Sequence, residues 1–424
     1  MKMTKQEKSW ILYDWANSVY ATIMMAAVVP IYFSAMAKEA GQAGDYWWSI
    51  ATSAAMLLTA VAAPLIGALA DYWGYKKKLF VFFLIIALGF TMMSAVTSNW
   101  VFLMIGYAVS HIGFNAGNLV YDSFLPDVTT SDRMDKISAY GFAFGYIGGS
   151  TIPFIISIGL IQFGDKIGLT GTLPVQISIG ITVVWWLIFS IPFLKNIKQT
   201  HGIDKPDTGI FKEVFGNAVK TGKKIINDKK IFFFVIAYFF YIDGVGTVIT
   251  MSTAYGATLG LDATGMILAL LVTQLVAFPC SILFGNLARK IGSITMLMIA
   301  IVIYLGVCIV GFFMGFGLEE QWFGTETALI LFWILAIMVG TVQGGIQAIS
   351  RSYFGKIVPP ENAGEFFGFF DIFGKFAAII GPMLYGFTKL ATGRSSLAIL
   401  SLVLLFFIAF IIMCVGRNHF KEKA

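Results

Sequence analysis

The stretch GALADYWG, residues 67–74, follows a long apolar run and recurs in altered form later in the chain. Its counterpart is GNLARKIG, residues 285–292, which lies 218 positions downstream. Both stretches begin and end with glycine at the same spacing, and glycine lets two membrane helices approach closely. A repeated loop of this kind predicts a chain built from two similar halves.

Matches at a second offset, of 229 positions, support a duplication. They fall on corresponding apolar runs of the two halves, so we predict a duplicated unit of six helices. The matched pairs are Asp14 with Asp243, Asp122 with Arg351, Ser123 with Ser352, Phe144 with Phe373, Gly145 with Gly374, and Pro153 with Pro382.

The composition is that of an all-α integral membrane protein. Of 424 residues, 58% are hydrophobic and only 12% are charged. Apolar runs of about 20 residues, the length that crosses the hydrocarbon core, recur along the whole chain. The first run lacks a cleavage site and is interpreted as a retained helix. We predict twelve transmembrane helices, at 10–37, 47–70, 79–97, 100–124, 137–162, 175–194, 231–255, 264–287, 295–315, 327–353, 365–389 and 396–416.

Positive charge is unevenly distributed between the loops. With the N-terminus inside, the inner segments hold 23 lysines and arginines and the outer loops hold four. This bias predicts that both termini are cytoplasmic. Because the charge borders the membrane helices, the net charge of +6 does not indicate a nucleic-acid partner.

One long connector, 195–230, divides the chain into an N-terminal half, 1–194, and a C-terminal half, 231–424. Its apolar residues follow a helical period, with lysines on the other side, which predicts an amphipathic helix on the inner membrane face. A partner-binding segment and a plain linker are the alternatives. The periodic residues are Phe211, Val214, Phe215, Ala218, Gly222 and Ile225.

Signatures of enzymes and of metal sites are missing from the sequence. Cys280, Cys308 and Cys414 all lie in apolar runs, where cysteine acts as a small packing residue. We find no phosphate-binding Walker loop, no zinc-protease spacing and no hydrolase elbow. We therefore predict no catalytic residues, no cofactor and no metal site.

The fourth predicted helix carries a polar stripe. His111, Asn115, Asn118 and Asp122 recur at steps of four, three and four residues, which places them on one helical face. We predict that the stripe lines a central cavity and that its histidine and asparagines contact a solute.

Two further assignments follow from this stripe and its duplicate on the tenth helix. Gln347, which the 229 offset pairs with Asn118, is also predicted to contact solute. His111 is predicted either to carry a proton or to be a packing residue. Asp122 and Arg351 are predicted to form an ion pair that closes the inner mouth of the cavity. The alternative is that each contacts headgroups or its own loop.

The eleventh predicted helix contains Asp371 and Lys375, which are four residues apart in the favourable order for an ion pair. Either they neutralise each other against protein, or Lys375 receives a negative group of the solute while Asp371 keeps it charged.

Asp243 lies deep in the seventh predicted helix, where it would be a proton carrier or a structural partner of Lys375. The glycine-rich segment 243–247 predicts a local break in that helix.

Several stretches resemble a known family. GALADYWGYKKK, from Gly67, resembles the loop signature of the major facilitator superfamily, although Tyr72 and Tyr75 stand where arginine is frequent. The stretches YDWANSVY, YDSFLPDV, ISAYGFAFGYIGG and EFFGFFDIFGKFAAIIGP resemble the autophagy-related vacuolar effluxer family and its bacterial relatives.

The resemblance implies a secondary transporter, which we expect to lie in a bacterial inner membrane and to be coupled to protons through Asp243 or His111. It would be a monomer, surrounded by lipid, that moves an amino acid or a related zwitterion or anion by alternating access between two pseudo-symmetric six-helix bundles. An exporter or translocator of amphipathic compounds or lipids, and a sensor built on a transporter fold, are the alternatives.

The loop signature also has a physical interpretation. Asp71 would lie at the start of the eleventh helix, whose unpaired backbone N–H groups favour a negative charge, and would hold the inner gate closed. The alternative is a loop that only sets the topology. Asp14 and Asn17 are predicted to form a polar patch near that gate rather than to face headgroups.

Overall fold

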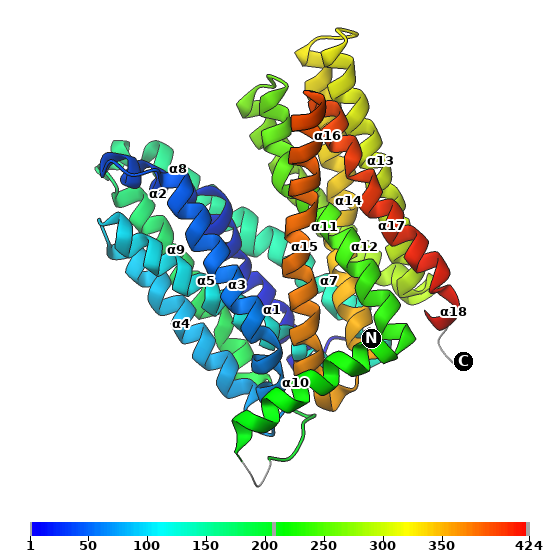
Figure 1. Cartoon of the computed structure of the whole chain (residues 1–424). Coiled ribbons are helices and arrows are strands. Elements are labelled where there is room, and N and C mark those ends of the chain that lie inside the picture. The colour runs from blue at the N-terminus through cyan, green and yellow to red at the C-terminus, as the bar shows by residue number, and fades with distance from the viewer. Residues whose placement is uncertain (1, 206–208, 421–424) are drawn as a thin grey trace. The chain divides into compact units, whose positions relative to one another are not determined.

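The computed structural model describes residues 2–205 and 209–420 of the chain. Within those residues the regular elements are helices, and the only β-bridge joins Tyr72 to Ile203 (Figure 1). The all-α prediction is therefore confirmed.

Most predicted membrane helices are single elements, and three are assembled from shorter ones. The first consists of α1 (Lys5–Tyr20), η1 (Ala21–Ala27) and α2 (Val29–Glu39). The fifth consists of α7 (Ser131–Phe144), η2 (Gly145–Thr151) and α8 (Ile152–Phe163), and the twelfth of α16 (Ser395–Ser401) and α17 (Val403–Val415).

The other membrane helices are α3 (Gly44–Ala70), α4 (Lys76–Val96), α5 (Trp100–Ser123), α9 (Leu173–Asn196), α11 (Lys229–Thr258), α12 (Ala263–Ile291), α13 (Ser293–Glu319), α14 (Thr325–Ile357) and α15 (Ala363–Thr392). The connecting and terminal elements are α6 (Leu125–Val128), η3 (Gly164–Ile167), α10 (Ile210–Asn227), η4 (Pro360–Asn362) and α18 (Arg417–Phe420).

Eleven helical segments in the described part of the chain are long and apolar enough to cross a membrane. The remaining predicted helix, the fourth, corresponds to α5, which has 24 residues and is long enough to span, but is not one of the eleven. The polar stripe lowers the mean hydropathy of α5. The residues that make this helix a candidate for function therefore also make it harder to recognise as a membrane helix from hydropathy.

The chain divides into two compact units. Unit 1 comprises the described residues of Met1–Thr130, Phe144–Ala218 and Pro359–Phe369. Unit 2 comprises those of Ser131–Ala143, Val219–Val358 and Phe370–Ala424. Each unit thus contains one short segment from the other half of the sequence. The predicted boundaries 1–194 and 231–424 stay a prediction.

The repeated loops mark close helix contacts in both units. In unit 1, a Cβ added to Gly67 of α3 would lie 2.1 Å from the carbonyl oxygen of Gly364 in α15. In unit 2, a Cβ added to Gly285 of α12 would lie 2.4 Å from the Cβ of Ala139 in α7. Glycine is needed at both positions because a side chain would overlap the facing helix, so the repeated sequence makes corresponding contacts.

The predicted break in the seventh membrane helix is wrong. Helix α11 is continuous through residues 243–247. Gly244 serves helix packing instead, because a Cβ there would lie 2.6 Å from the ring of Phe406. Two π-helical segments, η1 and η2, interrupt the first and fifth membrane helices instead, and neither was predicted from the sequence.

The amphipathic helix of the connector is present as α10, but only part of its predicted apolar face is buried. Val214, Ala218 and Ile225 are buried, whereas Phe215 is exposed. The side chain of Phe211, which belongs to the same prediction, lies outside the described residues.

Replacing Gly67 by alanine should destabilise the protein by about 1–3 kcal/mol, because the added methyl group overlaps the α15 backbone. The measurement is the thermal unfolding midpoint of the purified protein in detergent. Gly89→Ala in α4 is the matched control, since a Cβ there meets no atom within 4 Å. Equal midpoints for the two variants would contradict the packing argument.

Candidate transport site and gate

Asp71 follows the last residue of α3 and contacts the first turn of α15. Its Oδ1 accepts the backbone N–H of Gly364 at 2.7 Å, and its Oδ2 accepts that of Glu365 at 2.8 Å. These N–H groups lie in the first helical turn, where they have no intrahelical acceptor, and the helix dipole favours the carboxylate. The contact predicted from the loop signature is therefore present. We call these two hydrogen bonds the Asp71 clamp.

The connector braces the loop that carries the clamp. The N–H of Ile203 donates to the Asp71 carbonyl at 2.9 Å, and the N–H of Trp73 donates to the Ile203 carbonyl at 3.1 Å. Gln199 adds its Oε1, which accepts the N–H of Gly74 at 3.0 Å. The sequence analysis missed this brace, because a single short bridge has no periodic pattern.

Asp127 is a second buried carboxylate, and the sequence analysis assigned it no role. Its Oδ2 accepts a hydrogen bond from Lys76 Nζ at 2.8 Å, and both side chains are fully buried. Its Oδ1 accepts the backbone N–H groups of Thr200 and His201, each at 2.8 Å. Asp127 thus links the start of the connector to the end of the fourth helix. Its presence in the stretch YDSFLPDV is the feature of the sequence that could have indicated this role.

Asp135 of α7 performs a similar task in unit 2. Its carboxylate accepts hydrogen bonds from Ser352 at 2.6 Å, Lys356 at 2.5 Å and Ser293 at 2.9 Å. The sequence analysis missed it, although the 229 offset pairs Asp135 with Gly364 of the Asp71 clamp.

Arg351 is buried within protein, so its side chain does not reach headgroups. Its Nε donates to Ser138 Oγ at 2.9 Å, and its guanidinium lies 4.5 Å from the centroid of the Phe142 ring. Its pairing with Asp122 stays a prediction.

The polar stripe of α5 is partly joined to α1. Asn118 Oδ1 accepts a hydrogen bond from Asn17 Nδ2 at 2.7 Å, so residues that we assigned to the solute site and to the gate are in contact. His111 is buried, with its ring 5.3 Å from that of Tyr107. Asn115 Nδ2 is buried and has no hydrogen-bond partner among the described residues. Asp14 is buried as well, which excludes the headgroup-facing alternative.

The eleventh membrane helix carries the predicted Asp371–Lys375 ion pair. Asp243 of α11 contacts α15 farther along: its Oδ1 and Oδ2 accept the N–H of Gly381 at 3.0 and 2.8 Å. That N–H precedes Pro382, which disturbs the helix at this point. No ion pair joins Asp243 to Lys375 within the described part of the chain, so that alternative is wrong.

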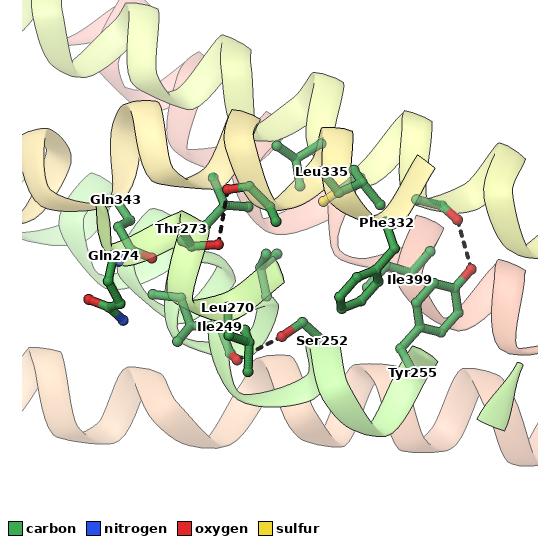
Figure 2. A pocket seen from close by; sticks show the side chains of 16 residues that line it. Ile249, Ser252, Tyr255, Leu270, Thr273, Gln274, Phe332, Leu335, Gln343 and Ile399 are labelled. Atoms are coloured by element: carbon green, nitrogen blue, oxygen red, sulfur yellow. Dashed lines mark hydrogen bonds between the residues drawn. The ribbon is translucent and has the colours of Figure 1, made fainter. Parts of the chain in front are cut away.

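Unit 2 also contains a largely apolar cavity between its helices (Figure 2). Gln274 and Gln343 lie at one end of it, and Phe332 and Tyr255 at the other. Gln347, a predicted solute contact, donates its Nε2 to the Gln343 carbonyl at 3.0 Å and is thus next to the cavity lining. The remaining labelled residues are Ile249, Ser252, Leu270, Thr273, Leu335 and Ile399.

Comparison with known proteins identifies the family. A family model described as vacuole effluxer Atg22-like matches residues 48–421. The chain belongs to this family. An uncharacterized MFS-type transporter, YxiO of Bacillus subtilis, is 46% identical over 421 residues, covering 97% of this chain and 95% of its relative.

A more distant relative agrees with this assignment, and a solved structure shows the same fold. Autophagy-related protein 22 of Cryptococcus neoformans is 25% identical over 65% of this chain, which spans about half the length (48%) of that fungal relative. The structure of the major facilitator superfamily transporter FucP superposes with a TM-score of 0.71 over 99% of this chain and 98% of its own, at 16% identity.

This member of the Atg22-like family therefore has the twelve-helix major facilitator fold. Its relatives are transporters, so the chain is a multi-pass membrane transporter rather than an enzyme.

The Asp71 clamp should strengthen as the pH falls. Burial raises the pKa of Asp71 from 3.8 to about 7, with Glu365 adding to the rise, while Lys76 and the two N–H donors act in the opposite direction. Between 3.8 and about 7, the clamped carboxyl holds a proton that a solvated one has released. Raising the pH through this range therefore weakens the clamp, and above it the clamp no longer depends on pH.

Opening of the Asp71 clamp is measured by pulsed electron paramagnetic resonance between two spin labels. The labels are placed at Lys78 and Glu361, two exposed positions of unit 1. The distance distribution should shift to longer values as the pH rises toward 7. The same titration of Asp71→Asn should be flat, and an unchanged pH response in this variant would rule out Asp71 as the titrating group.

Proposed function

We propose that this chain is a proton-coupled secondary active transporter for a small solute with a charged or zwitterionic head, such as an amino acid or a related anion. The observation that carries the proposal is the Asp371–Lys375 pair within membrane helix α15, whose side chains are 25% and 9% exposed. Ionised groups are costly in lipid and mark solute or ion pathways when they are retained.

Lys375 would bind the negative group of the solute. Its ammonium already has a carboxylate partner one helical turn away, so it stays charged without the solute. The solute's carboxylate would then compete with or join Asp371, and the amides of Asn115, Asn118 and Gln347 would add neutral hydrogen bonds. Asn115 supports this assignment because its buried Nδ2 lacks a partner among the described residues.

The cavity of unit 2 favours solutes that also have an apolar part. Its wall is formed mostly by aliphatic and aromatic side chains, and the two glutamines supply polar groups at one end only. Binding an apolar part of the solute in such a cavity is favourable, because the lining excludes water from it. The same observation supports the second candidate function, export of amphipathic compounds.

Two groups would couple transport to protons. Asp243 is buried in α11 and accepts an N–H of α15, so protonation would weaken a contact between two membrane helices of unit 2. His111 is buried on the polar stripe of α5 and is the other candidate.

Alternating access would require gates that open and close. The Asp71 clamp, the predicted Asp122–Arg351 pair and the patch of Asp14 and Asn17 would act at the inner side, with both termini cytoplasmic. The halves 1–194 and 231–424 would move as the rocking bodies of a monomer in a bacterial inner membrane.

Flux into proteoliposomes tests the proposal. With an inward or outward pH gradient imposed, the protein should accumulate a labelled amino acid, and competition with a panel of amino acids, organic anions and amphipathic cations should rank zwitterions with apolar side chains first. Preferential competition by amphipathic cations would favour the export function. No flux of any solute, with ligand binding retained, would instead indicate a sensor.

Variants of Lys375 test its proposed role in the same flux experiment. Lys375→Gln should raise the KM about tenfold to a hundredfold, because a charge-assisted hydrogen bond contributes about 1.5–3 kcal/mol. Lys375→Arg should lose less because it keeps the charge. Lys389→Gln, in the last turn of the same helix, should leave transport unchanged.

Asp243→Asn should abolish accumulation driven by a pH gradient while solute exchange continues. The amide cannot release a proton, so the carrier would no longer be tied to proton movement, yet its solute site would be intact. Parallel measurements of gradient-driven uptake and counterflow separate the two activities. Unchanged gradient coupling would exclude Asp243 as the proton carrier, and His111→Gln is then the variant to measure.

A further inference from the structure

Helix α10 of the connector packs against the transporter through one apolar stripe. Val214, Ala218 and Ile225 lie on this stripe and are buried. Val214 packs against Ala68 and Tyr72, at the end of α3 and in the loop of the Asp71 clamp. This face of α10 already has a partner and is not available to another molecule.

A second apolar stripe on α10 is exposed. Phe215, Val219 and Ile226 are 64%, 50% and 66% exposed, and Gly222 lies between them on the same line. The steps of four, three and four residues place all of them on one side of the helix, about 100° around from the buried stripe. We call these three side chains the α10 ridge. A contiguous exposed ridge of large apolar side chains marks a contact surface.

The position of α10 in the chain places it at the membrane surface. It ends at Asn227, and membrane helix α11 begins at Lys229. Asp228 alone lies between them, and its carboxylate caps α11 by accepting the N–H groups of Lys230 and Ile231. Toward its other end, α10 packs on the end of membrane helix α3 through Val214. Both ends of α10 are thus held where membrane helices end.

Among the exposed lysines of α10, one lies beside the ridge. At about 100° per residue, Lys223 is about 70° around the helix from the ridge, within reach of a headgroup next to it. Lys224 is about 170° away, on the opposite side. Interfacial helices have such an arrangement, with apolar side chains in the acyl boundary and basic side chains at its edge.

We propose that the α10 ridge inserts into the headgroup–acyl boundary of the bilayer and that Lys223 binds the phosphate of an anionic lipid beside it. The partner is the lipid surface itself, because a bilayer is the apolar phase that lies at the ends of α3 and α11. This surface does not depend on which solute is transported.

The contact links lipid composition to the gate. The same helix that carries the ridge packs on Tyr72, next to Asp71, and Asn217 Nδ2 donates to the Tyr72 hydroxyl at 3.5 Å. Docking of α10 on anionic lipid therefore also restrains the loop that carries Asp71, because α10 packs against Tyr72 in that loop. Transport should respond to the fraction of anionic lipid, and this response should require Lys223.

A site-directed fluorescence experiment on the full chain tests the insertion. Cys414, the exposed native cysteine, and Cys280 are replaced by serine, buried Cys308 is kept, and a single cysteine at Ile226 or at Lys224 carries an environment-sensitive fluorophore. In bilayers of phosphatidylcholine with phosphatidylglycerol, the label at 226 should be quenched by doxyl-labelled lipid and protected from iodide. The label at 224 should show the reverse.

Quenching of the 226 label by iodide but not by lipid would overturn the proposal and leave the ridge to a protein partner. If the cysteine variants fail to fold, amide hydrogen exchange of the unmodified chain gives the same decision. Exchange in α10 should slow when phosphatidylglycerol is added to phosphatidylcholine bilayers, and exchange that is indifferent to phosphatidylglycerol would overturn the proposal.

Two matched charge variants test the lipid phosphate contact. Lys223→Gln should shift the phosphatidylglycerol fraction needed for α10 docking and for full transport, with an apparent affinity about fivefold weaker, the effect of one lysine near an anionic surface. Lys224→Gln removes the same charge from the opposite side and should leave both unchanged. Equal effects of the two variants, or no effect of either, would refute the assignment of Lys223.

Discussion

Polar groups inside a membrane helix need partners within the protein, because hydrocarbon offers none. At several places the chain meets this requirement with side chains that reach from one helix to another. Asn17 of α1 binds Asn118 of α5, and Asp243 of α11 accepts the N–H of Gly381 in α15. Each such contact fixes the distance between two helices. The need to pair buried polar groups therefore also determines how the helices pack.

The Asp71 clamp applies this constraint at the end of a helix. The first N–H groups of α15 would lack acceptors if no other element supplied them, and the close approach at Gly67 brings the carboxylate of Asp71 to them. Because burial raises the pKa of the Asp71 carboxyl to about 7, the contact is sensitive to protonation.

The two repeated loops have diverged in their polar chemistry while keeping their glycine packing. Where the first loop has Asp71, the second has the exposed Arg289, whose guanidinium carries donors only and cannot accept backbone N–H groups. In unit 2 the carboxylate comes instead from Asp135 on the facing helix. Sequence duplication thus preserved the close backbone approach, and the charge moved from one partner of the contact to the other.

The amino-acid sequence by itself determined the membrane class, the twelve helices, the duplication and the family, because each depends on local hydropathy, on loop charge or on residues that recur at fixed offsets. It also placed Asp71 at the start of α15 and paired Asp371 with Lys375, since both follow from helix periodicity and end effects. Tertiary structure decided that α11 is unbroken at Gly244, that Asp243 binds Gly381 rather than Lys375, and that Asp127 and Asp135 are buried anchors. These outcomes depend on which side chain of a distant helix fills a given space, and no periodic pattern within one segment encodes that.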